Sequence, residues 1–383
     1  MKNKVFTPLI FLASLGAGGV AIIPFALLQY TVAHEKGLIK MSDLNYDAMS
    51  GLTSSFFHSL EAIMIVFIVI HIVLSVIFFK KLTKFVKSEN YQNFISDPLK
   101  NSAILAPFIS IVMTMNVFIG PVRYFLPAMS ANLQGMMLPA LLFWIFLWAW
   151  LMKVEIKLLK TSFEKGFDMS KITFGWLLHP FALGMMTVTG TGIAAMAENP
   201  SIAHTAVFLS LVSGTMGLFL LIVKTISVFQ RHFNSQEGLG EKQFLPSFLI
   251  VVPNITLYAI SIFRFGHYLE KHHHMHLDSY FLIVMTVAFA FETWYMLFGL
   301  ALLKDYFTKH HFKSEHYVTQ WGLICPFVAY AVLGSFVYNV FVQSQILYGV
   351  IIISTIIAIV LFFDLLIRYI KCNKKAQIGF ICE

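Results

Sequence analysis

Charged residues and cysteines are scarce in this sequence of 383 residues. Asp, Glu, Lys and Arg make up 12% of it, about half the share in a typical water-soluble protein. Hydrophobic residues make up 58%, and the mean hydropathy is +0.77. The three cysteines, Cys325, Cys372 and Cys382, are too few and too scattered for a disulfide framework or a four-cysteine zinc site. These shortages exclude a water-soluble fold and a disulfide-stapled domain.

Ten apolar runs of about 20 residues or more fill the chain, each long enough to cross a hydrocarbon core of roughly 30 Å. They fall near 6–30, 54–79, 102–122, 129–152, 172–197, 202–230, 244–264, 277–303, 319–341 and 345–370. Barrel strands would be shorter and would alternate polar with apolar residues, so the runs predict helices. No linker separates them. We expect one all-α membrane domain over 1–383, with ten spanning helices over about 6–370 and a short tail at 371–383.

The basic residues predict the orientation. Net charge is +8, but the lysines and arginines lie in short loops rather than in one stripe, so no nucleic-acid partner is expected. All but five of the 27 lie on the side of the two termini, and the five are Lys36, Lys40, Arg123, Arg264 and Lys271. By the positive-inside rule, both termini are predicted to be cytoplasmic, in a multi-pass protein of the inner (cytoplasmic) cell membrane.

Residues that break helices gather in the odd-numbered runs. They include Gly16, Gly19 and Pro24 in the first run, Pro107 in the third, Pro180 in the fifth, Pro253 in the seventh and Pro326 in the ninth. In the even-numbered runs only Pro139 is comparable. Breaks are tolerated where a helix faces a cavity. The pattern therefore predicts five helical hairpins, with the odd helices around a central pore and the even helices outside; close helix packing is the alternative explanation for any single break.

Neutral polar residues also lie at mid-depth in the odd runs, among them Asn116, Thr189, Asn254 and Thr256. Such groups suit a partly dehydrated anion, because a fixed cation would bind it too tightly to release it. Arg123 and Arg264 lie near the outer ends of the third and seventh runs, where they would concentrate anions at a mouth or anchor the helices at the interface. Together the residues predict a pore for small anions.

Three segments carry a resemblance to a known family. They are Ser14-Leu-Gly-Ala-Gly-Gly19 with Pro24, Leu245-Pro246 followed by Pro253, and Trp321-Gly-Leu-Ile-Cys-Pro326. Over its whole length the chain resembles the tellurite-resistance and C4-dicarboxylate transporter superfamily, which includes the TehA-type channels and the slow anion channels of plant guard cells. The resemblance implies an anion channel or facilitative transporter that forms a homotrimer in membrane lipid. Each subunit would have its own five-helix pore, closed by an aromatic side chain of the ninth helix.

The gate position departs from the pattern of that superfamily. In the plant and bacterial channels a phenylalanine immediately precedes the proline of the ninth helix, whereas here Cys325 precedes Pro326 and Phe327 follows it. The resemblance therefore implies a constriction at these three residues, with Phe181 as a second aromatic candidate. The alternative is that Cys325 is a small buried hydrophobic side chain.

Acidic residues in the apolar runs leave a second function open. Glu61, Glu292 and Asp364 all lie in even runs, where a carboxyl group can tie helices or subunits together. Glu292 is the deepest and would be the coupling group of a proton-coupled exporter of dicarboxylates or of oxyanions such as tellurite or sulfur oxyanions. Transport that collapses with the pH gradient would favour this function.

Histidines raise two further possibilities. The cluster from His267 to His276, with His272, His273 and His274, is expected in an outer loop without ordered ligand spacing, so no metal site is predicted. A haem oxidoreductase with His58 and His71 as ligands would need a second helix that carries a matching pair of histidines. His179 and His204 do not form such a pair, because they lie on different helices. We expect neither a cofactor nor an enzyme.

Overall fold

The computed structural model of the chain describes residues 6–35, 37–234, 238, 240–311 and 316–377. Within these ranges ten helices are long and apolar enough to cross a membrane, one on each predicted run, and there is no strand. The ten spans are Pro8–Thr31, Gly51–Val86, Asn101–Phe125, Leu133–Lys165, Phe174–Met196, Pro200–Asn234, Lys242–His273, Asp278–Leu302, Val318–Val340 and Gln345–Cys372. The predicted all-α membrane fold is confirmed.

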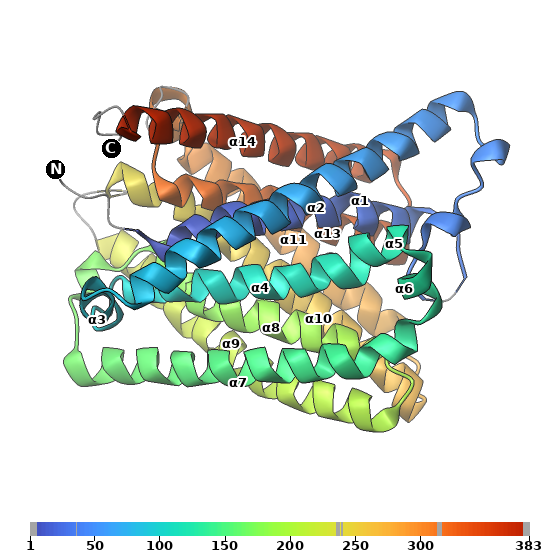
Figure 1. Ribbon diagram of the computed structural model, residues 1–383, viewed down its shortest axis with the longest axis horizontal. Coiled ribbons are helices and arrows are strands. Elements are labelled where there is room, and N and C mark those ends of the chain that lie inside the picture. The colour runs from blue at the N-terminus through green and yellow to red at the C-terminus, as the bar shows by residue number, and fades with distance from the viewer. Residues whose placement is uncertain (1–5, 36, 235–237, 239, 312–315, 378–383) are drawn as a thin grey trace.

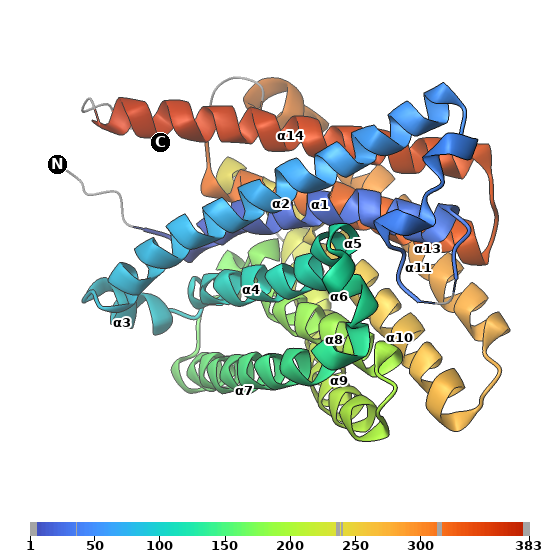
Figure 2. The ribbon, with the colours of Figure 1, turned by 45° about the vertical axis from the view of Figure 1, so that its right-hand side comes forward.

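The odd-numbered spans form an inner ring, in which each helix contacts the next and the last contacts the first. The ring helices are α1 (Phe11–Thr31), α4 (Ala106–Val117), α8 (Leu178–Met196), α10 (Val251–His273) and α13 (Ile324–Val340). The even-numbered spans lie outside it, as α2 (Gly51–Val86), α7 (Leu133–Lys165), α9 (Pro200–Asn234), α11 (Asp278–Leu302) and α14 (Gln345–Gln377). Figures 1 and 2 place α14 along one edge of the bundle and α7 along the opposite edge, with the inner helices between them.

Burial separates the two sets of helices. In the inner spans 67% to 100% of the most apolar window is buried, against 28% to 44% in the outer spans. The outer helices expose large apolar side chains, for example Val69, Phe146, Phe219, Val287 and Ile353. Lipid tolerates such a surface, whereas water would not.

Each inner span begins with a 3-10 segment on the side where the two termini lie, which we call the terminal side (Figure 1). The five segments are η1 (Pro8–Ile10), η4 (Asn101–Leu105), η7 (Phe174–Leu177), η8 (Lys242–Ile250) and η10 (Val318–Leu323). They contact one another in a closed ring, in the same order as the helices that follow them.

Four of the predicted helix breakers mark these starts. Pro107, Pro180, Pro253 and Pro326 follow one another at intervals of 73 residues, and each lies in the first turn of its α-helix. A proline there removes no intrahelical hydrogen bond, because the first-turn N–H groups have no partner within the helix. Among the prolines predicted as breakers of the inner ring, Pro24 alone lies deep inside an α-helix.

Shorter elements lie at the ends of the spans and between them. On the terminal side they are α3 (Asn90–Ile95), η6 (Met169–Lys171), α12 (Lys304–Tyr306) and the π-helical turn η9 (Phe307–His311). On the opposite side, which we call the far side, they are η2 (Met41–Asp43), η3 (Tyr46–Ala48), the π-helical turn η5 (Phe118–Val122), α5 (Arg123–Phe125) and α6 (Pro127–Ala131). The helix α14 continues to Gln377, so the predicted tail at 371–383 begins as helix, and residues 378–383 with Cys382 lie outside the described residues.

Candidate functional site: a cavity inside the helix ring

A cavity of about 1190 Å³ lies inside the ring, and all five inner helices line it. At the far side its lining includes the exposed loop residues Asn132 and Glu198. Toward the terminal side the lining ends at a floor, formed by Leu15, Gly16, Phe181, Pro253 and Cys325. The ring of 3-10 segments lies beyond this floor. The described lining therefore extends from the far side to this floor, and it includes no residue of the five 3-10 segments.

Small residues on α1 bring that helix close to α13 along the cavity wall. A Cβ atom on Gly16 would lie 3.1 Å from Ile324, and one on Gly19 would lie 2.9 Å from Val328. The distance at Gly19 is shorter than real Cβ contacts show. A larger residue at position 19 would therefore require α1 or the Val328 side chain of α13 to shift. Both glycines line the cavity.

The structure brings together only part of the predicted lining. Gly16, Gly19, Asn116, Thr189 and Pro253 line the cavity. The other four predicted residues, Pro24, Pro107, Pro180 and Asn254, are buried in helix packing and are absent from the described lining. The Nδ2 group of Asn254 donates to the carbonyl of Ile250 at 2.9 Å. Thr256, two residues further along α10, faces the cavity instead.

Two of the lining residues form a polar pair. The Nδ2 group of Asn116 on α4 donates to the hydroxyl of Thr189 on α8 at 2.9 Å, and the Thr189 hydroxyl lies 3.1 Å from Oδ1 of Asn116. The pair gives the apolar wall one neutral hydrogen-bonding position at mid-depth.

Among the gate candidates, two form part of the floor. Cys325 and Phe181 line the cavity, whereas Pro326 and Phe327 are buried and lie outside its described lining. Cys325 is thus in the cavity wall, as is Phe181 on α8. No floor residue carries a charge.

Arg264 is the innermost charged side chain of the cavity wall. Its Nη1 group donates to the carbonyl of Val188 at 2.7 Å. A Cβ atom on Gly192 would lie 2.9 Å from that Nη1 atom, so the glycine makes room for the guanidinium. No carboxylate lies within ion-pair distance of Arg264 in the part of the chain that the structure describes. At the mouth of the cavity, Oε2 of Glu270 lies 2.9 Å from Nδ1 of His267, so this carboxylate has a partner other than Arg264.

The second predicted arginine has a different environment. Arg123 is 2% exposed and lines a separate pocket of about 140 Å³ rather than the cavity. Its Nη2 group donates to the carbonyl of Ile39 at 2.6 Å, and its Nε group donates to the carbonyl of Ile119 at 3.2 Å. Arg123 therefore ties the loop after α1 to the end of the third span.

Two of the intramembrane carboxyl groups have hydroxyl partners. Glu292 on α11 is completely buried, and its Oε1 atom accepts a hydrogen bond from the hydroxyl of Thr256. Its Oε2 atom has no hydrogen-bond partner among the described residues. Because Thr256 also lines the cavity, one hydroxyl lies between the chamber and this carboxyl group. Glu61 on α2 accepts from the Tyr124 hydroxyl at 2.6 Å.

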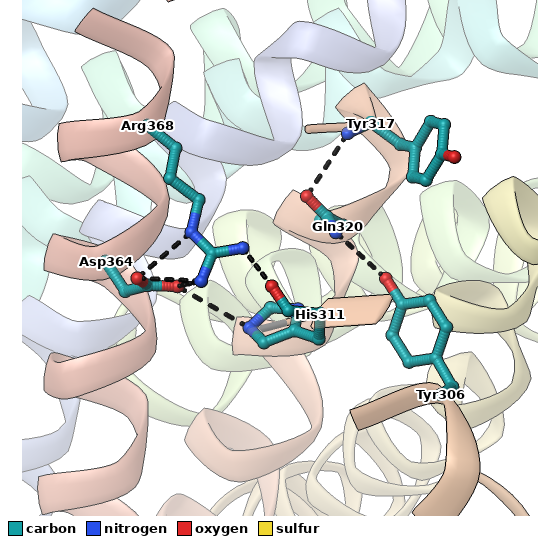
Figure 3. Close-up of polar contacts among 6 residues, drawn as sticks. All are labelled: Tyr306, His311, Tyr317, Gln320, Asp364 and Arg368. Carbon is teal, nitrogen blue, oxygen red and sulfur yellow. Dashed lines mark hydrogen bonds and ion pairs between the residues drawn. The ribbon is translucent and has the colours of Figure 1, made fainter. Parts of the chain in front are cut away.

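Asp364 belongs to a cluster on the terminal side, which Figure 3 shows. The Nε and Nη2 groups of Arg368 donate to Oδ1 of Asp364 at 3.0 Å, and its Nη1 group donates to the carbonyl of His311. His311 Nε2 lies 3.6 Å from Oδ2 of Asp364. Burial, followed by the nearby Arg368, lowers the pKa of His311 to about 4. The cluster docks η9 against α14.

A second contact in Figure 3 holds the segment that leads into the ninth span. The Nε2 group of Gln320 donates to the Tyr306 hydroxyl at 3.0 Å, and the backbone N–H of Tyr317 donates to Oε1 of Gln320 at 3.2 Å. Because Gln320 lies in η10, these contacts link the start of the ninth span to α12.

The histidine cluster differs from the prediction. His267, His272 and His273 lie on α10, which extends beyond the predicted end at 264, so the predicted outer loop is wrong for these three residues. The helix ends at His273, and the next residue, His274, has a left-handed conformation with φ 54°. Among the described residues no group of three or more His, Cys, Asp or Glu side chains could hold a metal ion.

A family model described as a voltage-dependent anion channel matches residues 5–370, which is nearly the whole chain. No curated protein matches the chain.

Proposed function

Since the chain belongs to the voltage-dependent anion channel family, we propose that it passes small anions through the cavity inside its helix ring. Membership places it among anion channels and transporters. In the proposed route, anions enter the cavity from the far side, pass Arg264 and the pair of Asn116 and Thr189, and cross the floor near Cys325.

Arg264 is the observation that carries this proposal. A guanidinium that has no carboxylate partner and borders a largely apolar chamber attracts an anion more strongly than it would in open water. Its Nη1 group is held by the Val188 carbonyl, so the charge is fixed in place. Beyond it the wall offers only neutral donors, which lets an anion leave again.

The floor is the closure in this proposal. Cys325 and Phe181 face the same end of the chamber, and an apolar constriction excludes a hydrated ion by dewetting. Passage then requires the Phe181 ring to move away from Cys325. The gate therefore includes the ninth span, through Cys325, and the fifth span, through Phe181.

The surroundings complete the proposal. The terminal side is cytoplasmic, because it carries most of the basic residues, and the protein lies in the inner (cytoplasmic) membrane. The exposed apolar faces of the outer helices contact lipid and two further copies of the chain, in a homotrimer.

A second function rests on Glu292. A carboxyl group that is buried in a spanning helix and linked to the chamber through the Thr256 hydroxyl is suited to carry a proton alongside an anion. In that case the chain is a proton-coupled exporter of dicarboxylates or of oxyanions such as tellurite or sulfur oxyanions. Glu292→Gln would then abolish the dependence of transport on a pH gradient, while leaving anion exchange without a gradient.

The test is efflux from proteoliposomes that contain the purified chain, across a panel of chloride, nitrate, sulfite, tellurite and small dicarboxylates. We expect faster efflux than from empty liposomes for at least one anion, and no increase for potassium or choline. An absence of efflux for the whole panel would contradict the proposal.

A further inference from the structure

Three ionisable side chains meet in a buried cluster behind α8, which the pathway above does not use. Glu155 on α7 and His179 on α8 are each 0% exposed, and Lys224 on α9 is 3% exposed. His179 Nδ1 lies 2.6 Å from Oε2 of Glu155. The ammonium of Lys224 lies 4.0 Å from the ring centroid of Trp176 and interacts electrostatically with Glu155 and His179. Ionisable groups at such positions are costly to bury and are functional candidates for that reason.

Unpartnered atoms show where the cluster can accept a proton. With a carboxylate as its partner, Nδ1 of His179 carries the hydrogen, so Nε2 has a free lone pair. Among the described residues neither Nε2 of His179 nor Oε1 of Glu155 has a hydrogen-bond partner. A proton from water on the terminal side can bind Nε2 while the Nδ1–H group continues to donate to Glu155. The half-buried Trp176, in η7, lies between the cluster and that side.

The cluster is adjacent to the floor of the cavity. His179 and Phe181 flank Pro180 in the first turn of α8, and Phe181 lines the floor. The hydroxyl of Tyr258 on α10 donates to the carbonyl of Pro180 at 2.7 Å. A change at His179 therefore acts on the same helical turn that positions the Phe181 ring.

The charge balance of the cluster gives the direction of the effect. The titratable groups that interact with His179 are Glu155 from α7 and Lys224 from α9, and Tyr258 from α10 interacts with Glu155. One added proton gives the cluster one more positive charge, whichever of its side chains binds it. Because the floor itself carries no charge, this positive charge lowers the cost of moving an anion across it.

We propose that Glu155, His179 and Lys224 form a proton-binding site whose loading promotes anion passage across the floor. The proposal rests on the proposed anion pathway and adds its regulation by pH. It assigns the pH response to the interface of α7, α8 and α9, rather than to Glu292 on α11.

Flux measurements at different pH values test this. Nitrate and chloride efflux from proteoliposomes would be measured between pH 8 and pH 5.5, with equal pH inside and outside so that no gradient drives transport. We expect a roughly tenfold rise for the parent chain as pH falls, and a flat profile for His179→Gln and for Glu155→Gln. The matched control is His71→Gln. His71 is equally buried, but both its ring nitrogens are occupied, by the Ser14 carbonyl at 2.6 Å and the Thr114 hydroxyl at 2.8 Å. This control should keep the pH profile of the parent.

A second readout does not depend on flux. Trp176 borders Lys224, so proton binding should change its emission, taken as the difference between the parent and Trp176→Phe. We expect this difference to titrate with the midpoint of the flux profile and to be constant in His179→Gln. Two results would overturn the proposal: emission and flux that do not change between pH 8 and 5.5, or a pH profile that Glu292→Gln removes and His179→Gln keeps. Titrating emission without any anion efflux would contradict the proposed function and leave only the proton site.

Discussion

Arg264→Gln is the substitution that bears most directly on the pathway. The change removes the positive charge and keeps a side-chain amide that can donate to the Val188 carbonyl, which Nη1 of Arg264 contacts at 2.7 Å. The wall of the cavity should therefore keep its shape. If anions bind at the guanidinium, their affinity for the chamber should fall.

The size of the loss follows from Coulomb's law. An anion that touches the guanidinium lies about 4 Å from its charge, where the attraction is about 1 kcal/mol in bulk water and about 4 kcal/mol at an effective dielectric constant of 20. The chamber reaches the far side and has mostly apolar walls, so an intermediate value of about 2 kcal/mol is appropriate. This corresponds to a roughly 30-fold rise in the anion concentration for half-maximal flux.

The assay is anion flux against concentration in proteoliposomes, with ionic strength held constant by an impermeant salt. Arg123→Gln is the matched control, because Arg123 donates to backbone carbonyls and lies outside the described lining of the cavity. It should lower stability by about 1 to 3 kcal/mol, as expected when a buried carbonyl loses its partner, and leave the half-maximal concentration unchanged. Equal shifts in the two variants, or no shift in Arg264→Gln, would refute the assignment.

Three further predictions concern the floor, the lining and the terminal side. Phe181→Ala should raise basal flux several-fold by widening the constriction, whereas Phe327→Ala should not, since Phe327 lies outside the described lining; equal flux in both would place the closure elsewhere. In a chain with Cys325, Cys372 and Cys382 replaced by alanine, Thr189→Cys should react with a water-soluble thiol reagent because Thr189 lines the cavity, and Asn254→Cys should remain unreactive because Asn254 lies outside the described lining. The pKa of His311 is about 4 in the folded chain and ordinarily 6.5. At pH values between these two, the docked state of η9 therefore binds fewer protons than the undocked state. Docking is therefore strongest above pH 6.5 and should weaken by up to roughly 3 kcal/mol as pH falls to 4; hydrogen exchange of residues 304–311 that does not rise over this range would contradict it.

The sequence is informative about the architecture because a membrane restricts a chain to few solutions. Continuous apolar runs must be helices where no water can satisfy the backbone, and all ten predicted runs lie on the ten spans of the described structure. The gathering of prolines in alternate runs indicated which helices form the ring. Their interval of 73 residues, from Pro107 to Pro326, is a further signal in the sequence that identifies four equivalent helix starts.

The details of the site depend on the rotation of each helix, which composition does not determine. Asn254 and Thr256 are two residues apart on α10, yet only Thr256 faces the cavity. Arg123 and Arg264 both lie near the far ends of inner spans, but Arg123 donates to the Ile39 carbonyl of a nearby loop, whereas Arg264 donates to the Val188 carbonyl in the wall of the cavity. These orientations depend on contacts between segments that are far apart in the chain.

The buried cluster behind α8 shows the same limit. From the sequence, Lys224 is one of the basic residues expected on the terminal side, and His179 is a candidate only as a haem ligand. Glu155 lies near the end of an apolar run and resembles an interfacial residue in the sequence. Only the packing of α7, α8 and α9 brings the three side chains together.

The central claim is that the chain passes anions rather than cations. The most direct measurement is the reversal potential of the purified chain in a planar bilayer, with a tenfold gradient of the potassium salt of the anion that leaves proteoliposomes fastest. Passage of a monovalent anion predicts a reversal potential close to the equilibrium potential of that anion, about 59 mV from zero. A reversal potential near that of potassium, or a current no larger than in a bilayer without the chain, would contradict the account.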